Sequence, residues 1–323
     1  MQNAQQSMSS TPDTPLPRAL DWLLLTILIL VGGTSFAMIR GAIETIPPAI
    51  VAVARLWIGA IMMLIIMHLA GRTLPTLFLR HDRGAAISPA WLAMIACGII
   101  GNSVPFLLFP WAQQYVPTGL AGIYMAIMPL WTIVLAALFA SEALTVPRVA
   151  GFALGFLGVV VLLIPSLMAP DATGIATATN GEALRAQLGL IVATLGYAGS
   201  AVIARRAPAI RPRAFSAGIL LSAALAATPA LFFTPINPED WSLISILCVI
   251  GLGIFATGMG AIIIIVIIQR NDAGFMSYAN YLTPIWAVLL GVLLFRERLH
   301  PLVFVALAII TLGLYVSQRR RIS

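Results

Sequence analysis

The sequence predicts an all-α membrane protein with ten transmembrane helices, arranged as two inverted five-helix repeats with both termini in the cytoplasm. Three observations predict this fold class. Of the 323 residues, 60% are hydrophobic and 9% are charged, which leaves too few polar groups to cover the surface of a soluble domain. Ten apolar runs are each long enough to cross a bilayer, which takes roughly 20 residues. One long stretch of the chain also occurs twice.

The repeated stretch begins at Gly119 and again at Gly274, 155 residues later. Aligned without a gap, the two copies share scarce residue types as well as leucines. The matched pairs are Gly119/Gly274, Pro129/Pro284, Trp131/Trp286, Leu135/Leu290, Leu138/Leu293, Glu142/Glu297, Leu144/Leu299 and Gly158/Gly313. Since tryptophan and glutamate are rare in this chain, their coincidence together with proline indicates a duplication rather than a shared apolar composition.

The duplication extends toward the amino-terminal side of both copies. At the same offset of 155, Gly98 and Gln114 match Gly253 and Gln269. At an offset of 165, Leu30, Ser35 and Arg40 match Leu195, Ser200 and Arg205. The second and seventh apolar runs resemble each other least.

The apolar runs define the predicted helices in chain order. They span residues 21–40, 47–70, 89–112, 117–140, 147–168, 186–204, 213–233, 241–269, 274–295 and 301–317. Residues 1–20 are polar and lack the pattern of a signal peptide, so we expect a disordered cytoplasmic tail. The first repeat then covers 21–168, a polar linker covers 169–185, the second repeat covers 186–317, and a basic cytoplasmic tail covers 318–323.

The distribution of arginine predicts the orientation of the chain in the membrane. If the amino terminus is cytoplasmic, the inner segments carry most of the arginines: Arg18, Arg72, Arg80, Arg83, Arg148, Arg205, Arg206, Arg211, Arg213, Arg270, Arg319, Arg320 and Arg321. The outer segments carry Arg40, Arg185, Arg296 and Arg298. Basic residues are enriched on the cytoplasmic side, which predicts cytoplasmic termini. A repeat with five helices must then insert its second copy upside down, which is an architecture of alternating-access carriers.

Two prolines at equivalent positions mark the middle of the fourth and ninth helices. Pro129 and Pro284 each remove a helical hydrogen bond, to the carbonyls of Met125 and Asn280. Because a bare carbonyl is costly in lipid, we expect both breaks to face protein or a wet cavity. Paired breaks in inverted halves indicate a substrate site. The alternative is a bend that serves packing alone.

Polar and aromatic residues near these breaks are the candidate lining of that site. Tyr278, Asn280 and Tyr281 form the most polar run inside a predicted helix, and side chains of this kind seldom face lipid. The alternative role for these side chains is hydrogen bonding between neighbouring helices. The other candidate substrate-binding residues are Tyr124, Met125, Trp131, Trp286, Asn102, Ser35, Ser200, Tyr197 and Met259. The two tryptophans have packing as their alternative.

Arg55 is the one charged residue well inside a predicted helix. A buried guanidinium is costly to desolvate, and it suits a carboxylate or phosphate ligand. We therefore include Arg55 among the candidate substrate-binding residues. The alternative is a structural role, in which Arg55 binds loop carbonyls or Glu44.

Several function classes lack support in the sequence. There is no Walker loop, and no cluster of His, Cys, Asp or Glu falls within the predicted spans. We therefore expect no enzyme, catalytic residue, metal or cofactor. The net charge of +7 comes from loop arginines and predicts no nucleic-acid partner. The expected partners are the lipid bilayer and a small-molecule substrate, and the expected state is a monomer or a weak homodimer.

These residues resemble the drug/metabolite transporter superfamily, specifically its ten-helix EamA-type members. The resemblance rests on Gly33-Thr34-Ser35-Phe36, on Pro47-Pro48 followed by Arg55-Leu56, and on the repeated stretches from Pro129 to Glu142 and from Pro284 to Glu297. It covers about residues 20–317. The family implies a central cavity between the two halves and export of small organic solutes. The organisation is similar to that of YddG-type amino acid exporters.

The sequence therefore predicts a secondary transporter of the bacterial inner membrane. It would export small organic metabolites, foremost amino acids and among them aromatic ones, by alternating access. A multidrug or organic-cation exporter is the alternative within transport. A membrane-embedded enzyme or a lipid-handling protein is the alternative from another class.

Overall fold

The computed structural model describes residues 18–81, 84–139, 145–168, 179–271 and 273–318. Within these ranges it contains nine helices that are long and apolar enough to cross a membrane, and one shorter apolar helix over Pro301–Ser317. All ten predicted helical segments are therefore present.

Five spans of the first copy come first in the chain. They are α1 (Ala19–Ala42), α2 (Pro48–Leu69), a composite of α3 (Pro89–Gly98), η1 (Ile99–Ser103) and α4 (Val104–Ala112), a composite of α5 (Thr118–Tyr124), η2 (Met125–Ile127) and α6 (Met128–Phe139), and α7 (Val146–Met168). A short hairpin of β1 (Phe78–His81) and β2 (Gly84–Ile87) stands between α2 and α3.

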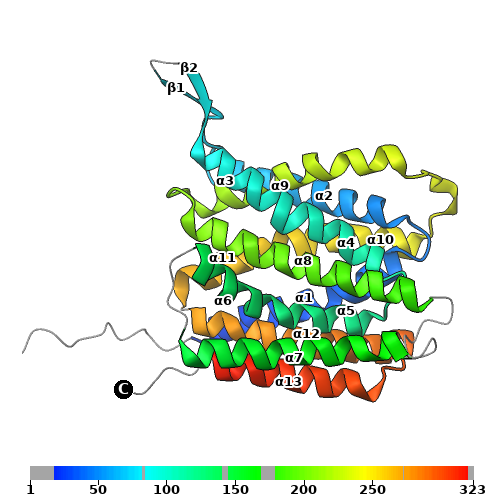
Figure 1. The fold of residues 1–323 in the computed structure, drawn as a ribbon. Coiled ribbons are helices and arrows are strands. Elements are labelled where there is room, and N and C mark those ends of the chain that lie inside the picture. The colour runs from blue at the N-terminus through cyan, green and yellow to red at the C-terminus, as the bar shows by residue number, and fades with distance from the viewer. Residues whose placement is uncertain (1–17, 82–83, 140–144, 169–178, 272, 319–323) are drawn as a thin grey trace, which may run out of the picture.

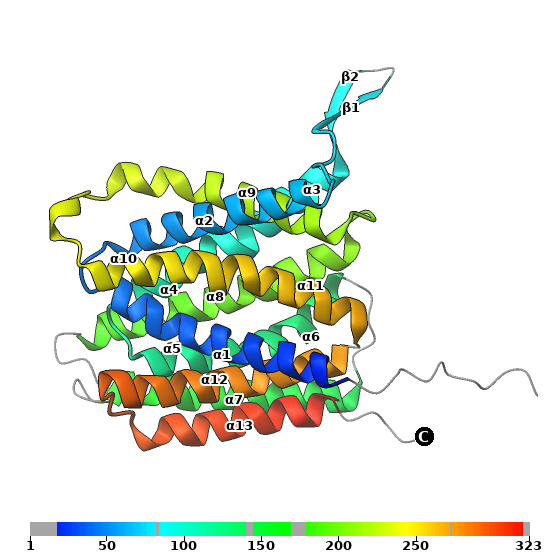
Figure 2. The ribbon, with the colours of Figure 1, turned by 180° about the vertical axis from the view of Figure 1, so that it is seen from behind.

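The second copy follows the same order. It comprises α8 (Asn180–Arg206), α9 (Pro212–Ala227) continued by η4 (Thr228–Phe233), a turn η5 (Pro238–Asp240), a composite of α10 (Leu243–Gly251), η6 (Leu252–Met259) and α11 (Gly260–Arg270), then α12 (Ala273–Phe295) and α13 (Pro301–Gln318). The spans run roughly side by side, and the start of α1 and the end of α13 lie at the same end of the bundle (Figures 1 and 2).

Two elements depart from the sequence expectation. Helix α8 begins at Asn180 rather than at residue 186, because Thr179 and Glu182 form a capping box: the Thr179 hydroxyl accepts from the Glu182 N–H and the Glu182 carboxylate accepts from the Thr179 N–H. The loop after α2 folds into the β1–β2 hairpin, which pairs Phe78 with Ile87 in antiparallel register. The hairpin projects from the bundle at the end where α1 begins (Figure 1).

Helices α7 and α13 pack through small residues. A side chain at Gly151 would strike the Gly313 carbonyl oxygen, and one at Gly158 would lie 2.7 Å from Ile310. A side chain at Gly313 would in turn strike the α7 backbone near Gly155. The small-residue face of α7 is therefore used inside the bundle, as interhelical contacts in membranes favour.

The two copies interlock through their third helices. A Cβ atom at Gly98 would lie 2.7 Å from the Ile219 carbonyl oxygen in α9, and one at the equivalent Gly253 would lie 2.5 Å from Ile58 Cβ in α2. Each third helix thus packs closely against the second helix of the opposite copy. This arrangement positions the middle of the bundle, where the candidate site lies.

Candidate functional site

Two π-helical stretches occupy equivalent places in the two copies. The first is η1 (Ile99–Ser103), and the second is η6 (Leu252–Met259). Shifting the first by 155 residues places it at 254–258, inside the second. The π-helix is rare and is frequently found at functional sites. The paired irregularities are therefore candidates for the region of the site.

A side-chain hydrogen bond of the same kind is present in both π-helical stretches. In the first copy the Asn102 amide donates a hydrogen bond of 3.3 Å to the Cys97 carbonyl oxygen. In the second copy the Thr257 hydroxyl donates one of 2.9 Å to the Leu252 carbonyl oxygen. Asn102 and Thr257 are 155 residues apart, and each reaches the carbonyl five residues before it. Polar side chains thus take up carbonyl groups at the two irregular turns.

Arg55 of α2 lies against the second π-helical stretch. Its Nε and Nη2 atoms both donate to the Thr257 hydroxyl at 3.3 Å, and its guanidinium carbon lies 4.0 Å from the centre of the Phe106 ring. The side chain is only 6% exposed. Among the described residues, Arg55 makes no ion pair with a carboxylate, and its hydrogen-bond partner is Thr257 rather than Glu44 or a loop carbonyl.

The Phe106 ring lies over this guanidinium, and further aromatic rings pack in sequence from Phe106. The Tyr197 ring of α8 lies 6.5 Å from the Phe106 ring and 6.2 Å from the Phe109 ring, centre to centre. Phe36 of α1 lies 5.5 Å from Phe109. We call Arg55, Thr257, Phe106, Phe109, Tyr197 and Phe36 the central cluster. Its members come from α1, α2, α4, η6 and α8, so both copies contribute.

The two proline positions differ. Before Pro129 the helix tightens into the 3₁₀ turn Met125–Ile127, and the Met128 N–H donates to the Met125 carbonyl oxygen. The Met125 carbonyl is thus not bare, contrary to the sequence expectation, because the shorter 3₁₀ bond replaces the one that proline removes. Around Pro284, α12 continues as one uninterrupted α-helix.

The polar run of α12 does not lie as one group. Tyr278 is 48% exposed, and its ring lies 5.8 Å from that of Trp22, near the start of α1. Tyr281 is partly buried and packs on the main core, and Asn280 is partly buried. Tyr278 lies in an aromatic group with Trp22 and Phe275, and the role of these three residues in substrate binding stays a prediction.

Other predicted site residues have partners within the bundle. The fully buried Tyr124 donates a hydrogen bond of 2.7 Å to the Gln187 side chain. Ser35 donates to the Gly32 carbonyl, and Ser200 lies 3.5 Å from the Cys97 carbonyl oxygen.

Three further predicted residues have contacts of other kinds. The Trp286 indole donates a hydrogen bond of 3.0 Å to the Thr34 hydroxyl. Trp131 lies beside Phe152 and packs on the main core, and Met259 is partly buried against the core around Ile263. The assignment of these residues to a substrate site is a prediction.

Two features of the site were missed by sequence reasoning. The first is the pair of π-helical stretches, for which the glycines of each segment are at most a weak signal. The second is the set of phenylalanines around Arg55. Phe106 and Phe109 are three residues apart and therefore share a helix face, which would have indicated a common neighbour.

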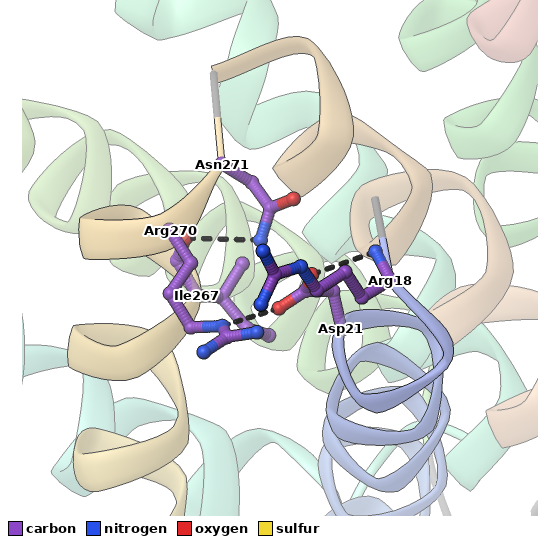
Figure 3. A network of polar contacts seen from close by, with 5 residues as sticks. All are labelled: Arg18, Asp21, Ile267, Arg270 and Asn271. Carbon is purple, nitrogen blue, oxygen red and sulfur yellow. Dashed lines mark hydrogen bonds and ion pairs between the residues drawn. The ribbon is translucent and has the colours of Figure 1, made fainter. Parts of the chain in front are cut away.

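A separate polar network fastens the start of α1 to the end of α11 (Figure 3). The Arg270 Nε atom donates to an Asp21 carboxylate oxygen at 2.5 Å, and the other oxygen accepts from the Arg18 N–H at 2.9 Å. Asn271 donates to the Ile267 carbonyl oxygen. Asp21 is 3% exposed and Arg270 is partly exposed. This network joins the two copies at one end of the bundle, away from the π-helical stretches.

A second link between the copies involves one of the repeated glutamates. The Glu297 carboxylate accepts hydrogen bonds from the Thr118 N–H at 2.6 Å and the Gly119 N–H at 2.9 Å, and so caps the first turn of α5. Glu297 follows α12 in the second copy, whereas α5 belongs to the first. Its repeat equivalent Glu142 lies outside the described residues. Capping explains why a carboxylate is needed in this loop.

The described residues contain no group of three or more His, Cys, Asp or Glu side chains that would hold a metal ion. Cys97 and Cys248 are both free thiols.

Comparison with known proteins places the chain in a family. The model of the EamA-like transporter family matches it twice, over residues 20–164 and 184–318. The chain is similar to the uncharacterized inner membrane transporter YedA of Escherichia coli, with 26% identity over 90% of each protein. It is also similar to a probable amino-acid metabolite efflux pump of Escherichia coli, with 25% identity over 92% of this chain and 94% of the pump.

A solved crystal structure shares the fold, with a TM-score of 0.60, 22% sequence identity, and coverage of 94% of this chain and 97% of the other. The two family matches each contain one copy of the five-helix unit. Together with the multiple membrane-spanning helices, these similarities identify a multi-pass protein of the bacterial inner membrane. The chain belongs to the EamA-like transporter family of the drug/metabolite transporter superfamily.

Proposed function

We propose that this protein exports amino acids, including aromatic ones, across the inner membrane by alternating access. The observation that carries the proposal is the central cluster: a buried guanidinium without a carboxylate partner among the described residues, which lies over the Phe106 ring and is linked through that ring to further aromatic side chains. Amino acids carry the complementary groups, a carboxylate and a side chain that is often apolar.

Arg55 is the proposed anchor for the substrate carboxylate. A charge that is taken out of water is costly unless it is paired, and hydroxyl and ring contacts compensate an ion only in part. Thr257 and Phe106 supply such partial compensation. A carboxylate would pair with the guanidinium through charge-assisted hydrogen bonds, which are the stronger kind. Binding would therefore complete an interaction that the empty protein leaves incomplete.

The rings of Phe36, Phe106, Phe109 and Tyr197 are the proposed apolar wall for the substrate side chain. Transfer of apolar and aromatic groups out of water lowers the free energy, and offset or edge contact between aromatic rings lowers it further. Ring-to-ring distances of 5.5–6.5 Å in this group are within the usual range for aromatic pairs. A planar side chain would therefore suit this wall.

Transport would follow from the duplication. We propose that the second copy is inverted with respect to the first and that both termini are cytoplasmic, since most loop arginines then lie inside. Two similar halves of opposite orientation can exchange conformations, which opens a central site first to one side and then to the other. The proposed units for this movement are residues 21–168 and the second copy, which starts with α8.

Relatives support the amino-acid assignment. One is a probable amino-acid metabolite efflux pump, and a second is a probable terminal-alkyne amino-acid exporter of Streptantibioticus cattleyicolor, 38% identical over 74 residues. The second match covers 23% of this chain, so it bears on part of one copy only.

Counterflow in proteoliposomes tests the proposal. Vesicles that contain the purified protein and unlabelled L-phenylalanine are diluted into labelled L-phenylalanine, with and without a pH gradient. We expect labelled substrate to accumulate transiently, and neutral amino acids to compete. Exchange of quaternary amines in place of amino acids would instead support an organic-cation exporter, and then Arg55 would have no part in binding.

A further inference from the structure

We infer that the indole N–H of Trp131 is a hydrogen-bond donor for an oxygen atom of the transported solute. The inference rests on the proposed function and adds a specificity-determining residue to it. Trp131 Nε1 is buried and has no hydrogen-bond partner among the described residues. Buried donors in proteins are almost always paired, and within a bilayer no solvent is available to replace a missing partner. A buried donor without a partner in a carrier is therefore a candidate contact for the solute.

The second copy shows what the first lacks. Trp286, the repeat equivalent of Trp131, donates a hydrogen bond of 3.0 Å to the Thr34 hydroxyl of α1. At the offset of 165 that aligns Ser35 with Ser200, Thr34 aligns with Gly199 of α8. Position 199 has no side chain and offers no hydroxyl. The same indole is thus paired in one copy and unpaired in the other.

A side chain can be accommodated at position 199. A Cβ atom at Gly199 would lie 3.6 Å from Ile100 Cγ2 and 3.9 Å from Leu135 Cδ1, which are ordinary contact distances. Leu135 is one turn beyond Trp131 on α6, so position 199 faces the helix that bears the tryptophan.

The chemistry of the donor limits the class of ligand. An indole nitrogen only donates, so its partner must be an acceptor such as a carboxylate or carbonyl oxygen. It carries no charge, so it can donate to a neutral carbonyl as well as to a carboxylate, with the charge-assisted bond to the carboxylate being the stronger one. Trp131 would recognise the presence of an oxygen, whereas Arg55 would recognise the negative charge.

Three related probes separate these roles. L-Phenylalanine has a carboxylate, L-phenylalaninamide has a neutral carbonyl, and 2-phenylethylamine has neither. Their inhibition constants are measured against counterflow of labelled L-phenylalanine. In the wild-type protein we expect the amide to bind about tenfold more tightly than the amine, as one satisfied buried hydrogen bond allows. In Trp131→Phe this difference should fall below about twofold, since the ring remains and the donor is gone.

Position 199 provides an independent test that leaves Trp131 unchanged. Gly199→Thr places a hydroxyl where α1 carries Thr34, and Gly199→Val has the same shape without the hydroxyl. We expect Gly199→Thr to reduce the preference for the amide over the amine and to raise the melting temperature relative to Gly199→Val.

The outcomes distinguish the two proposals. A Trp131→Phe variant that retains the tenfold preference, or equal behaviour of the Thr and Val variants, would overturn the role of Trp131 and leave the amino-acid assignment standing. If the wild-type protein exchanges no L-phenylalanine or other amino acid, the proposed function fails and the role of Trp131 fails with it. An Arg55→Gln variant that no longer prefers phenylalanine over its amide, but still prefers the amide over the amine, would support both proposals.

Discussion

The two copies of the five-helix unit share a backbone plan but differ in their side-chain chemistry. Each carries a π-helical stretch that is supported by a polar residue, Asn102 in the first copy and Thr257 in the second. Thr257 also binds Arg55, whereas Asn102 contacts no cation in the described part of the chain. Trp286 donates a hydrogen bond to Thr34, and Trp131 has no hydrogen-bond partner among the described residues. The comparison teaches that duplication maintains the framework while the site itself is asymmetric.

The largest effect should come from the glycines that let the copies interlock. We expect Gly98→Leu to abolish folding, because its side chain would meet the rigid α9 backbone at 2.7 Å. Overpacking of this kind costs about 1–3 kcal/mol or more. Gly253→Leu should be as severe, because the Ile58 Cβ atom, which would lie at 2.5 Å, is fixed to the α2 backbone. Detergent-solubilised yield by size-exclusion chromatography measures both variants, and normal yield of either would contradict the close packing.

The second effect concerns the pair Asn102 and Thr257. Thr257→Val removes the hydroxyl that positions Arg55, and we expect L-phenylalanine affinity to fall about tenfold, as loss of one hydrogen bond to a charged group predicts. Asn102→Leu should lower stability and leave the preference for phenylalanine over its amide unchanged. Inhibition constants in counterflow measure the difference. Thr257→Ser, which keeps the hydroxyl, should restore affinity, and failure to do so would argue against positioning.

The third effect concerns the cap that joins the second copy to the first. Glu297→Gln weakens two charge-assisted hydrogen bonds at the start of α5, and we expect a loss of about 1–2 kcal/mol of stability. Glu182→Gln is the matched control, since Glu182 caps only its own helix at an exposed position and its loss should be smaller. Thermal unfolding followed by tryptophan fluorescence compares them. A larger loss for the control would contradict the role of Glu297 as a link between the copies.

The smallest effect should distinguish the two tryptophans. Trp286→Phe breaks a hydrogen bond of 3.0 Å and leaves Thr34 without its donor, so we expect a loss of about 1 kcal/mol. Trp131→Phe removes a donor that has no partner among the described residues, so stability should stay the same or rise. Melting temperatures in the absence of substrate measure both. Equal destabilisation would mean that the two indoles have equivalent surroundings.

Much of the framework could be predicted from the sequence because its causes are local. Apolar runs of bilayer length predicted all ten helical segments. The repeat could be detected in the sequence because rare residue types match between the two copies at one offset. The two matches of the family model to the chain agree with that duplication.

The site was less predictable because its geometry depends on contacts between distant helices. No local sequence pattern indicates that Arg55 forms a hydrogen bond with Thr257, which is 202 residues away. A π-helical turn results from packing and hydrogen bonding together, and its segments read simply as apolar helix. Proline was an incomplete guide, since Pro129 follows a 3₁₀ turn whereas α12 continues through Pro284. The hairpin after α2 was missed because the segment is short and charged.

The central claim is that Arg55 binds the carboxylate of an exported amino acid. Equilibrium binding of labelled L-phenylalanine to the purified wild-type protein and to Arg55→Gln tests it directly, with melting temperature as the control for folding. We predict saturable binding to the wild type, at least about tenfold weaker binding to the variant, and equal competition by 2-phenylethylamine in both. Equal affinity of the wild type and a folded Arg55→Gln variant for L-phenylalanine would contradict the claim.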